Sequence, residues 1–223
     1  MMGTGLTMDY YYKDKPEMYF SGIRGEMLEF IPDNACRVLD VGCGEGNFGL
    51  NVKNKRGAEV WGVEMYDDAA NTARLKLDHL LTGNIAADDL GLPEDYFDCI
   101  VFNDVLEHLQ YPWSVVEKMR KYLTPGGCIL ASIPNIRYYP NMIRLLVHKE
   151  WTYTDAGLLD RTHLRFFTKS SIRSMFESSG YKIVRLEGLQ YKAFPLYLKI
   201  INKLLGGGLG DMRYLRFACV ASK

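Results

Sequence analysis

The chain has 223 residues, of which 48% are hydrophobic and 24% are charged, a composition typical of a soluble globular protein. Twenty-seven basic residues balance 27 acidic ones, which argues against a charge-driven nucleic-acid partner. The five cysteines are scattered and form no CxxC pair, so we expect neither a metal site nor an iron–sulfur cluster. With no secretory-signal pattern and no apolar run of about 18 residues, we expect a cytoplasmic protein.

Strand-like and helix-like segments alternate along the chain. Short apolar runs typical of buried strands lie at 37–43, 59–65, 79–84, 96–105, 127–135, 181–189 and 215–222. Helical patterns lie between them at 47–56, 67–77, 112–123 and 168–179. This alternation predicts an α/β fold with a doubly wound, mostly parallel sheet, in which ligands bind beyond the carboxyl ends of the strands.

Three segments do not fit the alternation, although we expect the whole chain, 1–223, to form one domain. The tyrosine-rich residues 1–36 are expected to form a helical cover over the ligand cleft. Residues 136–167, rich in aromatics and arginines, are expected to be an acceptor lid. Residues 192–213 form an amphipathic insertion before the last strand.

The stretch VLDVGCGEGNFG contains a glycine-rich turn of the type that holds nucleotides. Its glycines follow a GxGxG spacing, and Asn47 occupies the place of the third glycine of the dinucleotide motif GxGxxG. Asp40 and Glu45 add two carboxylates, which repel a pyrophosphate. The turn therefore suits a cationic ligand without phosphate, such as S-adenosylmethionine.

The ends of the other strands offer groups that this ligand needs. Glu64 ends the second strand, where an acidic residue can accept both ribose hydroxyls. Asn84 and Ile85 follow the third strand, where an amide and a backbone group can contact the adenine. Asn103 ends the fourth strand beside the glycine turn.

Four segments together resemble the class I S-adenosylmethionine-dependent methyltransferases: VLDVGCGEGNFG, GVEM, FDCIVFNDVLEHL and LTPGGCILASIPN. The resemblance runs over about residues 37–135. It implies a Rossmann-like seven-stranded sheet of order 3-2-1-4-5-7-6 with the last strand antiparallel, S-adenosylmethionine as cofactor and S-adenosylhomocysteine as product. It also implies a cofactor site formed by Asp40, Gly42, Gly44, Glu64, Asn84, Ile85 and Asn103, although many relatives carry aspartate at position 84.

Two histidines are candidate catalytic bases. His163 lies in LLDRTHLRFFT, where an acid and two arginines surround it beside paired phenylalanines. The alternative is a salt-bridged clamp that holds the lid, with no catalytic role. His108 lies in DVLEHL just after the fourth strand, where the Glu-His pair is either a base or a scaffold feature of the family.

The lid sequence resembles methyltransferases associated with bacterial glycosyltransferases and surface-polysaccharide biosynthesis, which implies a sugar or glycan hydroxyl as acceptor. In that interpretation Asp160 or Glu107 orients His163, and Arg161 or Arg165 holds an anionic group. The rings expected to stack on the sugar are Tyr138, Tyr139 and Trp151. The alternatives are a small-molecule or quinone-type O- or N-methyltransferase, or a non-catalytic protein that binds S-adenosylmethionine.

The segment 194–205 places apolar residues around two lysines. It predicts a helix that covers the core or forms a homodimer contact. The other interpretation is a peripheral contact with a membrane surface, which suits a lipid-linked acceptor.

Overall fold

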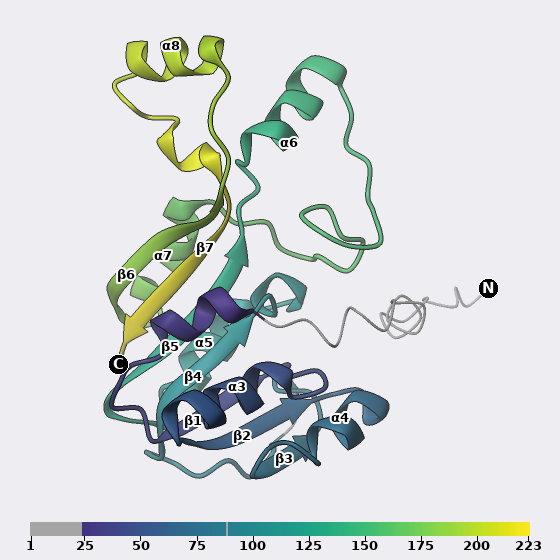
Figure 1. Cartoon of the computed structure of the whole chain (residues 1–223), viewed down its shortest axis with the longest axis vertical. Coiled ribbons are helices and arrows are strands. Elements are labelled where there is room, and N and C mark those ends of the chain that lie inside the picture. The colour runs from purple at the N-terminus through teal and green to yellow at the C-terminus, as the bar shows by residue number, and fades with distance from the viewer. Residues whose placement is uncertain (1–23, 88) are drawn as a thin grey trace, which may run out of the picture.

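The computed structural model describes residues 24–87 and 89–223 (Figure 1). Its seven strands are β1 (Arg37–Val41), β2 (Glu59–Glu64), β3 (His79–Thr82), β4 (Phe97–Asn103), β5 (Leu123–Pro134), β6 (Lys182–Tyr191) and β7 (Tyr214–Ser222). They form one sheet of order β3-β2-β1-β4-β5-β7-β6. Strands β1 to β5 pair in parallel, and β7 runs antiparallel to both of its neighbours. The predicted α/β fold, strand order and antiparallel last strand are confirmed.

Helices cover both faces of this sheet. On one face, α5 (Pro112–Met119) and α7 (Lys169–Ser178) pack into a core that alternate strand residues complete. On the other face, the short helix η1 (Gly25–Phe30), α3 (Asn47–Arg56) and α4 (Asp67–Ala73) contribute to a second core. Buried strands sandwiched in this way are apolar on both faces, which explains the continuous apolar runs of the sequence.

The helix ends follow local chemistry. Thr168 and Ser171 form a reciprocal capping box at the start of α7. Gly57, with φ of 67°, ends α3 in the left-handed conformation that favours glycine.

Three predicted boundaries are wrong. The helix expected to reach residue 123 ends at Met119, and β5 begins at Leu123 rather than at residue 127. Leu123 pairs with Phe97 across a register shift, so the sequence TPGG lies inside an irregular strand. Likewise α4 ends at Ala73, followed by a turn, instead of continuing to residue 77.

The two insertions project from the same end of the molecule (Figure 1). Within 136–167, α6 (Tyr139–Ile143) continues into η3 (Arg144–His148) and then into a long loop. Within 192–213 lie α8 (Leu196–Leu204) and η4 (Gly210–Arg213). No residue of α8 is buried, so this helix does not cover the core of its own chain.

Most of the expected N-terminal cover lies outside the described residues, of which η1 is the first helix. Within the described part of the chain, none of the helices has the length and apolar character needed to cross a bilayer.

Candidate active site

The glycine turn after β1 takes a conformation that other residues rarely adopt. Gly42, Gly44 and Gly46 have φ angles of 68°, 54° and 77°. The Gly42 amide donates to the Val63 carbonyl at 2.8 Å, which ties the turn to β2. A Cβ atom added at Gly42 would lie 2.7 Å from Val105 Cγ2. The turn therefore needs glycine at this position for both its φ angle and its close packing.

Glu64 braces this turn from the neighbouring strand. Its Oε2 accepts from the Gly44 amide at 2.8 Å, while Oε1 accepts from the amides of Met65 and Tyr66 at 2.8 and 3.0 Å. Glu64 is buried, and burial raises the pKa of its carboxyl group despite these hydrogen bonds. The side chain holds the glycine turn against the carboxyl end of β2.

Asp40 lies on the neighbouring strand β1, where it pairs with Gly62 of β2, and it is also buried. Its Oδ2 has no hydrogen-bond partner among the residues that the structure describes. Burial, followed by the charge of Glu64, raises the pKa of Asp40 to about 8, although the Gly49 backbone amide opposes the shift. A positively charged ligand would stabilise the ionised form of both carboxyl groups.

Asn103 presents a second unsatisfied group at the end of β4. Both polar atoms of its amide are buried, and neither has a hydrogen-bond partner within the described ranges. Buried amides without partners are costly and are rare in folded proteins. A polar ligand in this place would satisfy the Asn103 amide.

These groups line one cavity of about 880 Å³ at the carboxyl ends of β1, β2 and β4. Asn84 and Ile85, which follow β3, line it as well. The Asn84 Oδ1 accepts from the Ala86 amide at 2.9 Å, which closes a local turn at this wall. The structure thus brings all seven predicted cofactor residues to one cavity.

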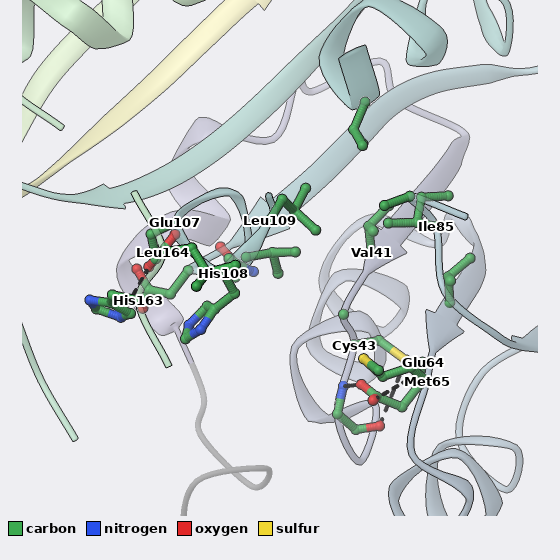
Figure 2. A pocket seen from close by; sticks show the side chains of 18 of the residues that line it. Val41, Cys43, Glu64, Met65, Ile85, Glu107, His108, Leu109, His163 and Leu164 are labelled. Carbon is green, nitrogen blue, oxygen red and sulfur yellow. Dashed lines mark hydrogen bonds and ion pairs between the residues drawn. The ribbon is translucent and has the colours of Figure 1, made fainter. Parts of the chain in front are cut away.

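The other end of the same cavity carries the two predicted catalytic histidines together with Glu107 (Figure 2). The His108 and His163 rings meet edge to face with their centroids 4.7 Å apart. His163 Nε2 lies 3.9 Å from Glu107 Oε1. Burial, followed by the proximity of His163, lowers the pKa of His108 to about 4, so this ring is neutral at pH 7.

Backbone carbonyls hold both imidazole rings. His108 Nδ1 lies 3.1 Å from the Thr162 oxygen, and His163 Nδ1 lies 3.0 Å from the Leu158 oxygen. A carbonyl oxygen only accepts, so each Nδ1 carries a proton and each Nε2 carries the lone pair of the neutral ring. In the candidate base His163, Nε2 lies on the side of the ring that faces Glu107.

Of the two acids expected to orient His163, Glu107 is the one beside its Nε2. Asp160 instead accepts from the amide and hydroxyl of Thr162 at 2.9 and 2.7 Å. It therefore shapes the turn that carries His163.

Sequence reasoning missed Arg216, which lines the cavity from β7. Its Nη1 pairs with Asp104 Oδ2 at 2.6 Å, and Arg24 pairs with the same oxygen. Asp104 also accepts from the Ser132 hydroxyl at 2.9 Å. An arginine within the apolar run 215–222 was the signal that could have revealed it, because a charged residue in a central strand needs a buried partner.

Comparison with known proteins identifies the family. A family model described as a methyltransferase domain matches residues 12–186. The chain belongs to this methyltransferase family. S-adenosylmethionine is therefore its methyl donor, a cationic ligand without phosphate of the kind that the acidic glycine turn predicted.

Curated relatives of this methyltransferase include two enzymes named ubiquinone biosynthesis O-methyltransferase. The one from Aeromonas salmonicida (strain A449) is 26% identical, with 74% of this chain and 70% of that protein covered. The one from Neisseria meningitidis serogroup A is 26% identical, with 86% of this chain and 82% of that protein covered.

Solved structures show the same fold at low identity. A methyltransferase from Archaeoglobus fulgidus has a TM-score of 0.66 and 20% identity, covering 96% of this chain and 100% of its own. The 1,6-didemethyltoxoflavin-N1-methyltransferase from Burkholderia thailandensis, solved with S-adenosylhomocysteine, has a TM-score of 0.58 and 15% identity, covering 95% and 80% of the two chains.

The residues of the methyltransferase cavity fit this cofactor. The unpartnered Asp40 and Asn103 groups offer acceptors and donors to a ligand that carries a sulfonium, an ammonium and an adenosine. The crowded Gly42 leaves backbone, rather than a side chain, facing the cleft. When bound, the cofactor supplies an electrophilic methyl group, and the protein must hold the acceptor substrate beside it.

Proposed function

We propose that this methyltransferase methylates the hydroxyl oxygen of a small-molecule acceptor. The acceptor that we favour is a phenol related to quinones, such as a hydroquinone. The observation that carries the proposal is the cluster of Glu107, His108 and His163, of which Glu107 and His163 are buried, at the far end of the cavity from Glu64 (Figure 2). This arrangement separates a donor end from an acceptor end within a single cavity.

A hydroxyl acceptor suits these histidines. A hydroxyl must lose its proton as the new bond forms, so a base within hydrogen-bond reach accelerates transfer by about 10²–10⁴-fold. In this proposal His163 Nε2 takes the proton, while Glu107, whose Oε1 lies 3.9 Å away, stabilises the imidazolium that results. An amine acceptor would need only its neutral lone pair. Relatives named as O-methyltransferases of ubiquinone biosynthesis support the same chemistry.

A sugar or glycan acceptor receives less support. None of the three aromatic residues expected to stack on a sugar lines the cavity. Tyr139 is buried and its hydroxyl donates to the Ala193 carbonyl at 3.2 Å, while Trp151 packs edge-on against Phe166. Arg161 pairs with Asp155 at 3.5 Å. We therefore rank the quinone-type acceptor above the glycan.

Within this proposal, residues 136–167 act as the acceptor lid and residues 1–36 as the cover of the cofactor. The lid brings His163 to the cavity, and its loop is anchored where the amides of Leu164 and Arg165 donate to the Glu107 carbonyl at 2.8 and 3.0 Å. Helix α8 adds a peripheral membrane contact, which brings the protein to a lipophilic acceptor.

An acceptor panel tests the proposed function. The protein is incubated with methyl-labelled S-adenosylmethionine and, separately, with phenols, hydroquinones, nucleotide sugars, lipid-linked sugars and primary amines. We expect label in the phenol or hydroquinone samples, with a methoxy carbon in the NMR spectrum of the product. Transfer confined to amines would contradict the proposal, and transfer confined to sugars would restore the glycan interpretation.

A further inference from the structure

The carboxylate of Glu107 and the rings of His108 and His163 converge closely enough to hold one ion. One ligand atom from each of the three lies within 4.8 Å of the other two. Nitrogen and oxygen ligands bind first-row cations at about 2.0–2.2 Å, so an ion at the centre of this triangle needs only small shifts of the side chains. These residues come from the loop after β4 and from the lid, so the site spans both.

The hydrogen bonds behind the rings match those of metal-bound histidines. Metal-binding imidazoles characteristically donate their other N–H to a carbonyl or carboxylate, which fixes the ring and its tautomer. Here the Thr162 and Leu158 carbonyls accept from the two Nδ1 atoms at 3.1 and 3.0 Å. These bonds favour the tautomer in which the lone pair that can bind a metal lies on Nε2 of each neutral ring.

Glu107 supplies a second, independent observation. Its side chain is 1% exposed, and neither carboxylate oxygen has a hydrogen-bond partner among residues 24–87 and 89–223. The nearby arginines Arg24 and Arg216 both pair with Asp104 instead. A buried carboxylate without hydrogen bonds is costly unless a cation compensates it.

We infer that Glu107, His108 and His163 bind a divalent first-row transition-metal cation. Two neutral imidazoles and one carboxylate form the ligand set typical of sites that keep coordination positions open. From the scattered cysteines we expected no metal site. This ligand set contains no cysteine, and its third member, His163, lies far along the chain in the segment 136–167.

The inference deepens the proposed function, on which its catalytic part rests. The acceptor oxygen coordinates the cation, which lowers the pKa of the hydroxyl, and the proton passes to solvent water. An oxygen lone pair then forms the new C–O bond with the methyl carbon. The C–S bond breaks, and its electron pair stays on sulfur to give S-adenosylhomocysteine. His163 is then a ligand rather than the base.

The competing explanation is a metal-free clamp in which His163 and Glu107 simply hold the lid closed. The two explanations differ in what a metal titration detects. A clamp has no reason to bind a cation at the three side chains, whereas a metal site binds one cation per chain even without methyl donor or acceptor.

The test is a titration of chelator-treated, dialysed full-length protein with Co²⁺ at pH 7.5, followed by the visible d–d absorption. The variants are Glu107→Gln, which keeps the shape of the side chain, and His163→Ala. His148→Ala is the control, because His148 is an exposed histidine outside the cluster. We expect saturation at one equivalent, affinity reduced at least 100-fold in both cluster variants, and no change in the control.

S-adenosylhomocysteine binding is measured on the same samples by calorimetry, which also shows that the variants are folded. Absence of saturable Co²⁺ binding below 1 mM, or equal affinity in wild type and Glu107→Gln, would overturn the inference. If the protein transfers methyl groups to phenols but binds no Co²⁺, the proposed function is supported and the metal site is wrong. If the protein binds Co²⁺ but methylates no phenol, the metal site is supported and the proposed phenol acceptor is wrong.

Discussion

His108 and His163 meet edge to face, with 4.7 Å between ring centroids, although one follows β4 and the other belongs to the lid. Both rings line the cavity at the end opposite the glycine turn. Their Nδ1 atoms both point to carbonyls of the lid, those of Thr162 and Leu158. The backbone path of residues 136–167 therefore sets the direction of both rings, so the chemistry at this end of the cavity depends on how the segment folds.

Replacing Gly42 by alanine should weaken cofactor binding. The change forces a Cβ to within 2.7 Å of Val105 in a turn with φ of 68°. Gly57→Ala is the matched control, because Gly57 has φ of 67° but nothing within 4 Å of the added Cβ. We expect both variants to lose about 1–2 kcal/mol of unfolding free energy from the φ angle, with a further loss in Gly42→Ala.

Calorimetry with S-adenosylhomocysteine then separates the two glycines. Affinity should fall at least tenfold in Gly42→Ala and stay at the wild-type value in Gly57→Ala. Equal affinities in all three proteins would show that the shape of the turn does not govern binding.

Replacing Asn103 by leucine should weaken cofactor binding without destabilising the protein. The amide has no partner among the described residues, so the folded state loses no hydrogen bond. We expect S-adenosylmethionine affinity to fall by about tenfold, or 1.4 kcal/mol, and the urea midpoint to stay or rise.

Asn135→Leu provides the contrast. The Asn135 amide is buried and donates to the carbonyls of Asp211 and Tyr214 at 3.0 and 2.9 Å. Its removal leaves those carbonyls unsatisfied and should lower the unfolding free energy by about 1–3 kcal/mol or more. Strong destabilisation of Asn103→Leu would mean that this amide has a structural role.

Cofactor affinity should rise with pH because of Asp40. Its pKa of about 8 means that the group is mostly protonated at pH 6–7, whereas a sulfonium and an ammonium favour the carboxylate. Binding then releases a proton, and affinity should rise by up to about tenfold per pH unit below pH 8 and level off above it. Calorimetry in buffers of different ionisation enthalpy measures the released proton.

The same group affects the stability of the free protein in the opposite direction. Because the folded pKa exceeds the unfolded value of about 3.9, the folded state binds more protons, and stability falls as pH rises from about 4 through 8. Asp40→Asn should remove both dependences. A wild-type affinity that is flat between pH 6 and 8 would contradict the assignment of Asp40 to the cofactor site.

Helix α8 should bind anionic lipid vesicles. Leu196, Ile200 and Leu204 are 73%, 53% and 81% exposed, and Lys199 and Lys203 accompany them on the same helix. Apolar residues with neighbouring lysines suit a lipid surface rather than water. In a flotation assay, wild type should rise with the vesicles and the double variant Ile200→Glu, Leu204→Glu should not.

Val184→Glu is the control for this assay, because Val184 is an exposed apolar residue on β6 rather than on α8. It should float like wild type. If the wild-type protein stays at the bottom of the gradient, the membrane contact is wrong. A concentration-dependent dimer that the α8 variant abolishes would support the homodimer contact instead.

The strands and the glycine turn could be predicted because both depend on local sequence, whereas the strand order was implied only by the family resemblance. Apolar runs report burial, and the GxGxG spacing with Asp40 reports ligand charge. The start of β5 could not be predicted from local sequence. The TPGG stretch is typical of the end of a helix, but pairing with β4 on both sides of it keeps it within a strand.

The acceptor end was harder to predict because it depends on the path of the backbone. His163 was found from its neighbours, but nothing in the sequence shows that the Leu158 and Thr162 carbonyls fix both rings. Arg216 acquires its role from β7 lying beside β5, which places it against Asp104. Trp151 packs against Phe166, and Tyr139 packs against Phe194. No local pattern distinguishes such packing from a surface that stacks on a sugar.

The most direct test of the division between donor and acceptor ends is one comparison of wild type, His163→Ala and His148→Ala. Single-turnover methyl transfer to the accepted phenol is measured together with S-adenosylhomocysteine affinity. The account predicts a rate at least 100-fold lower in His163→Ala, unchanged affinity, and wild-type behaviour of His148→Ala. A wild-type rate in His163→Ala, or a rate and affinity that fall together, would contradict it.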